Sequence, residues 1–153
     1  MKKEELSVLL YEFLEVIYLF QKKEEGLLGV SWQEIYLLKK LNDAESMSVG
    51  MIAKNLRSPL FGASRVVSRL TGLGLVKKSP AMENKRLINV EITKAGNRLL
   101  TRVEDYQFKL ITKNINVLKA AEIESMFSGL AKLRALLAIE FGGECKHLRL
   151  LKG

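Results

Sequence analysis

Residues 46–96 of this chain read SMSVGMIAKNLRSPLFGASRVVSRLTGLGLVKKSPAMENKRLINVEITKAG, and this stretch decides the fold. Near its start lies Ser48, a residue type that caps a helix by accepting a hydrogen bond from a backbone N–H group. Apolar residues then recur at three- and four-residue steps, namely Val49, Ile52, Ala53 and Leu56. This pattern predicts a short helix with one buried face.

A second helix is predicted to begin at Ser58-Pro59, where a cap oxygen precedes a residue that needs no hydrogen bond in the first turn. It should end at Gly74, because glycine readily takes the left-handed conformation just past a helix. Its expected buried stripe consists of Ala63, Val66, Val67, Leu70 and Leu73. The connection Arg57-Ser58 has only two residues, which favours a helix-turn-helix unit.

The opposite side of this second helix carries hydroxyl and guanidinium groups. Serine hydroxyls can donate to phosphates or base edges, and arginine can bond guanine or phosphate with two N–H groups. The candidate DNA-binding residues of this part are Ser58, Ser64, Arg65, Ser68 and Arg69. Leu60, Phe61 and Gly62 stand at the start of the helix, where we expect them either to touch thymine methyl groups or to pack against the protein.

Residues 75–78 and 87–92 are predicted to form two β-strands, because apolar and polar residues alternate in the second of them. The polar turn between the strands, residues 79–86, contains Pro80 and Asn84. Two helices followed by a hairpin predict a winged helix-turn-helix fold. Lys85 and Arg86 in the hairpin turn complete the candidate DNA-binding residues, at the duplex backbone or in the minor groove.

Residues 84–96 contain Asn84-Lys85-Arg86, then Ile92-Thr93 after five residues, and finally Gly96. This spacing resembles the Asp-x-Arg…Leu-Thr-x-x-Gly signature of the MarR family of bacterial transcription regulators. The preceding residues 64–70, SRVVSRL, and 74–76, GLV, resemble the recognition helix of that family and the entry to its wing. The family's order of helices fits nearly all of the chain.

The resemblance implies a homodimer that binds double-stranded DNA. It also implies a small aromatic or anionic effector, bound between the dimer helices and the DNA-binding part, although no particular residue indicates where. Two positions depart from the family pattern. Asn84 stands where an aspartate usually braces the wing arginine, and Gly72 stands where most members carry a charged residue.

The positive charge of the chain is concentrated in its middle third. The net charge of the whole chain is +8. Residues 54–102 hold eleven Lys and Arg against two Glu, a net charge of +9, so the rest of the chain has a net charge of −1. A basic face without a partner would more often spread over the surface. The distribution therefore favours a polyanionic partner for this segment.

The segments on both sides of residues 46–96 are predicted to be amphipathic helices. Residues 6–20 form the first, Gly26-Leu27-Leu28-Gly29 should break it, and Ser31-Trp32-Gln33-Glu34 is a capping box that begins the next helix. Trp32 and Tyr36 are expected in the core or an interface, with a small-molecule cleft as the alternative. Further helices are predicted over about 94–114, with Thr93 as N-cap, and about 120–141.

These outer helices have more apolar surface than one compact domain would bury, which predicts a homodimer. We expect a mainly α fold with a small β-hairpin, in one domain over residues 1–153. Residues 31–96 would form the winged helix DNA-binding part, and residues 1–25 and 97–153 would form the dimerisation helices. The basic tail 142–153 should extend the last helix or cover the partner.

Several other functions are disfavoured by the sequence. Residues 6–20 are too short and too charged to span a membrane, and their acidic residues oppose binding to an anionic membrane surface. Cys145 and His147 are the only residues of their types, so Cys145 cannot form an internal disulfide and no other thiol or imidazole can complete a metal site. No group of residues suggests catalysis. We therefore expect a cytoplasmic protein that is not an enzyme and holds no metal or cofactor.

The sequence thus predicts a sequence-specific DNA-binding transcription regulator of the MarR type, a ligand-responsive repressor that binds a pseudo-palindromic operator as a homodimer. The alternative is a dimeric protein-interaction module that keeps the winged-helix fold but has lost operator binding. Asn84 is the residue that supports this alternative.

Overall fold

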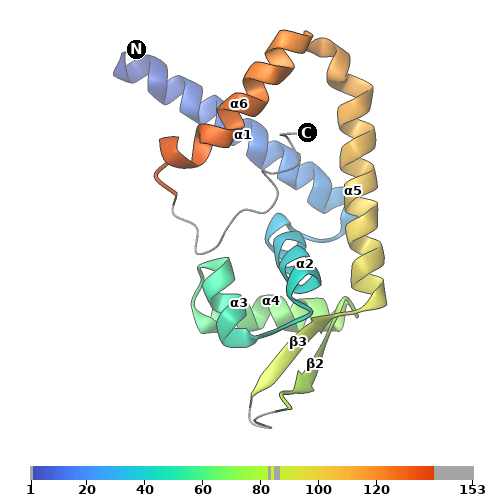
Figure 1. Cartoon of the computed structure of the whole chain (residues 1–153). Helices are drawn as coiled ribbons and strands as arrows, with labels where there is room; N and C mark the ends of the chain where they lie inside the picture. Colours follow the sequence, from blue (N-terminus) through green and yellow to red (C-terminus); the bar gives the residue numbers. More distant parts are fainter. Residues whose placement is uncertain (1, 83, 85–86, 140–153) are drawn as a thin grey trace. The chain divides into compact units, whose positions relative to one another are not determined.

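The computed structural model describes residues 2–82, 84 and 87–139 (Figure 1). Its helices and strands, in chain order, are α1 Lys3–Leu28, α2 Trp32–Ala44, β1 Ser46–Ser48, α3 Val49–Leu56, α4 Leu60–Gly72, β2 Val76–Pro80, β3 Ile88–Ile92, α5 Lys94–Asn114, the 3-10 helix η1 Ile115–Val117 and α6 Ala120–Leu136. The chain divides into two compact units, residues 1–107 and 108–153, and α5 crosses the boundary between them.

The first unit contains the predicted winged helix-turn-helix. Helix α3 packs against α4, and α2 packs against α3 and against the sheet. The predicted inner faces of α2 and α4 are confirmed by full burial of Ile35, Leu38, Leu41, Ala63, Val67 and Leu70. Two members of the predicted stripe of α4 differ, because Val66 is only half-buried and Leu73 lies beyond the helix with 49% of its surface exposed.

Local hydrogen bonds begin three of the helices where the sequence predicts them. The Ser48 hydroxyl accepts from the backbone N–H of Met51 at 3.2 Å at the start of α3. At the start of α5, the Thr93 hydroxyl accepts from the N–H of Gly96 at 3.1 Å. The predicted capping box at Ser31 is present at the start of α2. These caps satisfy N–H groups that have no partner within a helix.

The prediction that Ser58 caps α4 is wrong. Helix α4 begins at Leu60, with Pro59 in the N-cap position, and no side chain caps it. The Ser58 hydroxyl instead donates to the carbonyl oxygen of Pro59 at 3.4 Å. The connection between α3 and α4 is therefore one residue longer than predicted.

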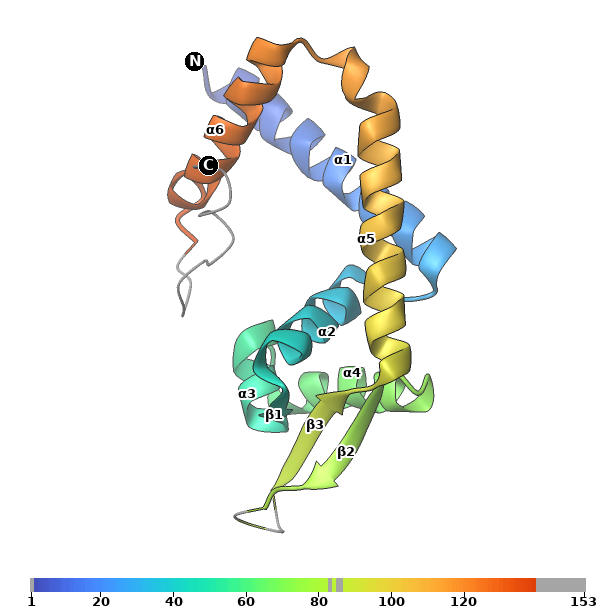
Figure 2. The same ribbon diagram turned by 45° about the vertical axis from the view of Figure 1, so that its right-hand side comes forward.

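The sheet has three antiparallel strands in the order β1-β3-β2. The hairpin of β2 and β3 was predicted, and it projects beyond α3 and α4 (Figure 2). Strand β1 was not predicted, because three residues are too few for a period-two pattern to be visible. It pairs with β3 so that Met47 lies opposite Val90, and both side chains are buried.

The base of this hairpin is tightly packed against the start of α5. The N–H of Thr93 donates to the carbonyl oxygen of Leu75 at 3.0 Å. A Cβ atom at Gly96 would collide with that same oxygen and would lie 2.6 Å from Cγ1 of Ile92. Only glycine fits at this position, which fixes the hairpin relative to α5 within the first unit.

Helix α1 is longer than predicted. It continues through Gly26 and ends at Leu28, where Gly29 takes a left-handed conformation with φ of 75° and donates to the carbonyl oxygen of Glu25. One glycine inside a helix costs only about 1 kcal/mol. The contact of Leu28 with the core offsets this cost, so Gly26 does not break the helix as expected.

A buried polar contact joins α1 to α5 in the first unit. The side-chain amide of Gln107 donates to Oε1 of Glu24 at 2.8 Å, and Glu24 is only 1% exposed. Among the described residues, Oε2 of Glu24 has no hydrogen-bond partner. Without Gln107, neither oxygen of the buried Glu24 carboxylate would have a hydrogen-bond partner among the described residues.

The N-terminal part of α1 presents a large apolar surface. Its large hydrophobic side chains are between 37% and 69% exposed, and they are Leu6, Val8, Leu9, Leu10, Tyr11, Phe13, Leu14, Val16, Ile17, Tyr18 and Leu19. A contiguous apolar surface of this kind is rare on monomers and usually marks an interface. Within the part of the chain that the structure describes, no helix has the length and apolar character needed to cross a membrane.

The second unit contains the end of α5, η1 and α6. Helix α6 begins at Ala120 as predicted but ends at Leu136, five residues before the expected end. Ala138 follows with a positive φ of 49°, a conformation that a helix cannot continue through. Phe141 and the tail 142–153 lie outside the described residues, as do Cys145 and His147.

Candidate nucleic-acid interface

The outward face of α4 is defined by its buried face. Ala63, Val67 and Leu70 point into the core. The helical period places Phe61, Arg65 and Ser68 on the opposite side, at steps of four and three residues. All three are exposed. Ser64 lies at the flank of this face and is half-buried.

Arg65 is the exposed cation at the centre of this face. Among the described residues, its guanidinium group has neither a hydrogen bond nor an ion pair. Arg65 can therefore bind a phosphate or a guanine base without first breaking an ion pair within the protein. Arg65 and Ser68 thus lie on the exposed side of α4, as predicted, while their contacts with DNA stay predictions.

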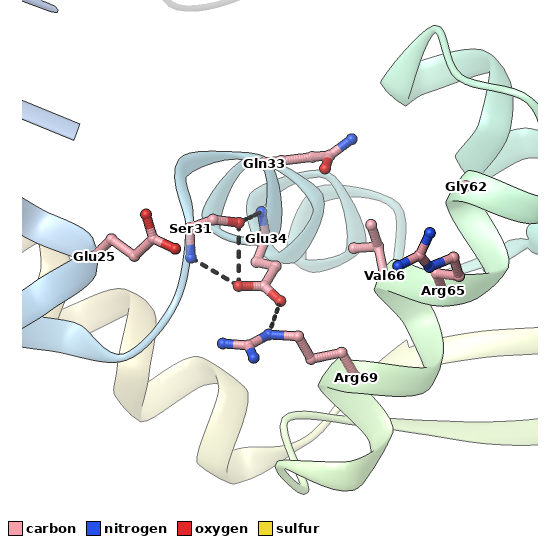
Figure 3. A pocket seen from close by; sticks show the side chains of 8 residues that line it. All are labelled: Glu25, Ser31, Gln33, Glu34, Gly62, Arg65, Val66 and Arg69. Carbon is pink, nitrogen blue, oxygen red and sulfur yellow. Dashed lines mark hydrogen bonds and ion pairs between the residues drawn. The ribbon is translucent and has the colours of Figure 1, made fainter. Parts of the chain in front are cut away.

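Arg69 is placed differently, because other parts of the protein hold its guanidinium group. Its Nε atom donates to Oε1 of Glu34 at 2.5 Å, and Nη2 donates to the carbonyl oxygen of Gly29 at 3.0 Å. Figure 3 shows the Arg69 side chain extending from α4 toward Glu34 on α2. The structure therefore separates Arg69 from Arg65, although the sequence predicted the same role for both.

The carboxylate of Glu34 has two functions in this arrangement. Its Oε1 binds Arg69, while its Oε2 accepts from the N–H and the hydroxyl of Ser31, at 2.7 and 3.1 Å. The side chain of Glu34 is only 5% exposed, whereas that of Arg69 is 55% exposed. The capping role of Glu34 was predicted from the sequence, but its bond to Arg69 was not, because residues 35 positions apart give no local signal.

A hollow of about 590 Å³ lies beside this ion pair (Figure 3). It is lined by Glu25, Ser31, Gln33, Glu34, Gly62, Arg65, Val66 and Arg69. Two arginines and two glutamates contribute to the lining, so its charges are balanced. The hollow therefore shows no electrostatic preference for an anionic or a cationic ligand.

Ser58 lies in the turn between α3 and α4 and is half-buried. A Cβ atom at Gly62 would lie 3.6 Å from both Cβ and Oγ of Ser58, so Ser58 sits against the first turn of α4. The structure thus brings it to the same end of the helix as Phe61. The contact of Ser58 with DNA remains a prediction from the sequence.

The hairpin carries an ion pair across its two strands. Lys77 on β2 lies 2.9 Å from Oε2 of Glu91 on β3, and the Ser79 hydroxyl donates to Oε1 at 3.1 Å. The hydrogen bond from Lys77, followed by that from Ser79, lowers the pKa of Glu91 below its ordinary value of 4.5. Lys78, the next residue of β2, is exposed and alternates to the other face of the strand.

The turn of the hairpin is only partly described. Asn84 is exposed, and its carbonyl oxygen accepts from the N–H of Leu87 at 2.9 Å. Lys85 and Arg86 lie outside the described residues. Their DNA contacts stay predictions from the sequence. No group of His, Cys, Asp and Glu among the described residues is arranged to hold a metal ion.

No family model matches the sequence. A curated relative from Bacillus subtilis (strain 168), the uncharacterized HTH-type transcriptional regulator YfiV, is 23% identical over 136 residues, which cover 89% of this chain and 85% of that protein. The structure of Streptococcus pneumoniae FabT in complex with DNA is similar with a TM-score of 0.69, at 18% identity, over 89% of this chain and 96% of FabT.

A crystal structure of MarR is similar with a TM-score of 0.68, at 18% identity, over 91% of this chain and 95% of MarR. These similarities confirm the predicted winged helix-turn-helix fold. They also confirm that the chain resembles the MarR regulators, in its fold and over most of its length.

Proposed function

We propose that this chain is a DNA-binding transcription regulator of the MarR type, which binds a pseudo-palindromic operator as a homodimer. The observation that carries the proposal is the outward face of α4, on which Arg65 is exposed and unpaired among the described residues. This helix stands in the segment 54–102, which has a net charge of +9. A basic segment on a helix-turn-helix is typical of proteins that bind a duplex.

The relatives support the same function. YfiV is named as an HTH-type transcriptional regulator, and FabT was crystallised with DNA. Both are matched over more than four fifths of their length. In this arrangement α4 is the recognition helix in the major groove, with Arg65 and Ser68 toward the bases and phosphates.

The homodimer is supported by the exposed apolar surface of α1. A single chain would leave the side chains of residues 6–19 in water, although burial of each large one contributes about 1.5–3 kcal/mol. A second copy of the chain would cover this surface. Two recognition helices related by a twofold axis would then meet successive major grooves about 34 Å apart.

Regulation through a small effector follows from the resemblance to the MarR family. An aromatic or anionic compound that shifts the dimer helices would change the spacing of the two recognition helices, and with it the affinity for the operator. In this proposal the chain is a repressor that such a compound releases from DNA. Binding to the operator should then weaken when a compound from an aromatic and anionic panel is added.

The proposal is tested by binding to duplex DNA from the region upstream of its own gene, at several salt concentrations. Each phosphate contact contributes about 0.9 to the slope of log K against log salt. Arg65→Ala should lower the affinity and reduce the slope. Lys3→Ala, which removes one exposed charge at the start of α1, is the matched control and should leave the slope unchanged.

Sedimentation of the purified protein tests the dimer. Val16→Glu introduces a charge at a position that is 64% exposed in the single chain. If this position faced solvent in the functional protein, the substitution would be tolerated. If α1 lies in the dimer interface, this variant sediments as a monomer and binds the operator weakly. Glu15→Gln, at the neighbouring exposed position, is the control. A wild-type monomer that binds no DNA would instead indicate a different function.

A further inference from the structure

We infer that Phe61 recognises thymine, by placing its ring against the 5-methyl group of the base in the major groove. The inference rests on the proposed DNA-binding function and goes beyond it, because it names the base and the side chain that select it. It starts from the position of Phe61, which lies in the first turn of α4. In a helix-turn-helix, the N-terminal residues of the recognition helix contact the base edges.

Phe61 belongs to the same line of side chains as the candidate DNA contacts. It precedes Arg65 by four residues and Ser68 by seven, so the three share one face of the helix. This face is opposite Ala63, Val67 and Leu70, which are fully buried. Any duplex that Arg65 and Ser68 contact through this face therefore lies against the ring of Phe61 as well.

The ring of Phe61 lies outside the hydrophobic core of the described part of the chain. Its side chain is 69% exposed, and it does not belong to the core cluster. A phenyl ring that is exposed to solvent does not contribute the hydrophobic stabilisation that it would contribute if it were buried. The first turn of α4 thus leaves an apolar group available for a partner.

The surroundings of Phe61 favour a nucleic acid over another protein. Residues 54–102 contain eleven Lys and Arg against two Glu, which favours a polyanion. The dense apolar surface that suits a second copy of the chain is on α1 instead. Of the four bases in a duplex, thymine offers a methyl group in the major groove, and phenylalanine is among the side chains that contact it.

The position of Arg69 strengthens the inference. Because Glu34 and Gly29 hold its guanidinium group, the outward line of α4 carries one arginine and not two. Base recognition along this line is then shared between the guanidinium group of Arg65, the hydroxyl of Ser68 and the ring of Phe61. An apolar contact makes up a larger part of the recognition than the sequence suggested.

The test uses a duplex that the full-length protein selects from a pool of randomised DNA. Each thymine of this duplex is replaced in turn by deoxyuridine, which removes only the methyl group. At one position in each half-site, the wild-type protein should lose affinity about fourfold, the equivalent of about 0.8 kcal/mol for one buried carbon. Phe61→Ala should bind the original duplex less tightly and should not distinguish thymine from deoxyuridine.

Leu60→Ala is the matched control, because Leu60 is 59% exposed but lies off the line of Phe61, Arg65 and Ser68. This variant should keep the full sensitivity to deoxyuridine. The inference is overturned if the wild type tolerates every deoxyuridine, or if Phe61→Ala remains as sensitive as the wild type. It is also overturned if Phe61→Ala changes the sedimentation of the protein without DNA, since Phe61 would then contact protein. Failure to select any duplex would overturn the proposed function itself.

Discussion

Replacing Glu34 by alanine should destabilise the chain by about 2–3 kcal/mol, because its buried carboxylate holds two partners. The substitution removes two sets of hydrogen bonds, one to Arg69 and one to Ser31. A hydrogen bond between charged groups contributes about 1.5–3 kcal/mol when buried, but Arg69 is 55% exposed, so we take about 1 kcal/mol for it. The Ser31 hydroxyl still caps α2 in this variant, but the N–H of Ser31 loses its acceptor on Glu34, which costs about a further 1–2 kcal/mol.

Urea unfolding at a fixed protein concentration measures this loss. Glu25→Ala is the matched control, because Glu25 lines the same hollow but pairs only with Lys22 among the described residues, where both side chains are exposed. It should cost less than about 0.5 kcal/mol. A double-mutant cycle with Arg69→Ala should give a coupling energy of about 1 kcal/mol. Strictly additive losses would show that the ion pair contributes nothing to the fold.

The same ion pair predicts how Arg69 behaves in DNA binding. If it persists in the complex, Arg69→Ala should leave the salt dependence of binding unchanged. Arg65→Ala should reduce the slope by about 0.9 for each subunit. An equal reduction for both variants would refute the reasoning, because Arg69 would then leave Glu34 and contact phosphate.

Three further predictions concern the hairpin and the contacts of α1 and α5 in the first unit. Gly96→Ala should prevent folding or destabilise the chain by several kcal/mol, because its methyl group has no space at the base of the hairpin, whereas Gly50→Ala in α3 should be neutral or stabilising in the same unfolding assay. The pKa of Glu91 is lowered in the folded state by its hydrogen bonds, so its contribution to stability is complete above about pH 4.5 and is lost as the pH falls through the lowered pKa. Unfolding followed between pH 6 and pH 3 should therefore depend less on pH in Glu91→Gln, and an identical dependence in both proteins would contradict this. Gln107→Ala removes the bond to a buried carboxylate on α1 and should cost about 1–3 kcal/mol in thermal unfolding, whereas the exposed Gln33→Ala should cost almost nothing; equal losses would contradict the role of that bond.

The elements that the sequence predicted correctly are those whose signals are local. Ser48 and Thr93 each cap a helix through an N–H group three residues later in the chain. The buried faces of α2 and α4 follow a period that a short window reveals. The left-handed conformation of Gly74, with a φ of 70°, could also be predicted locally, because glycine has no Cβ atom and adopts positive φ without a steric penalty.

The features that the sequence did not predict depend on residues far away in the chain. Strand β1 is three residues long and exists because β3, more than 40 residues later, offers it hydrogen bonds. Gly26 has a strong local signal for a break, but contacts of the next turn with the core outweigh it. Arg69 has the same local pattern as Arg65, and only the position of Glu34 on α2 separates the two.

The difference between Arg65 and Arg69 bears on how a movement of α1 would reach DNA in the dimer that we propose. The guanidinium group of Arg69 bonds both to the carbonyl oxygen of Gly29, at the end of α1, and to Glu34, in the first turn of α2. The Arg69 side chain of α4 therefore bonds to the C-cap residue of α1, the helix that we propose to form the dimer interface. A change in the direction of α1 must either carry Arg69 along or break its bond to Gly29. In the first case α4 shifts as a body, and in the second Arg69 keeps only its bond to Glu34 while its Nη2 atom loses its partner, so either outcome alters the surface that we propose to meet the duplex.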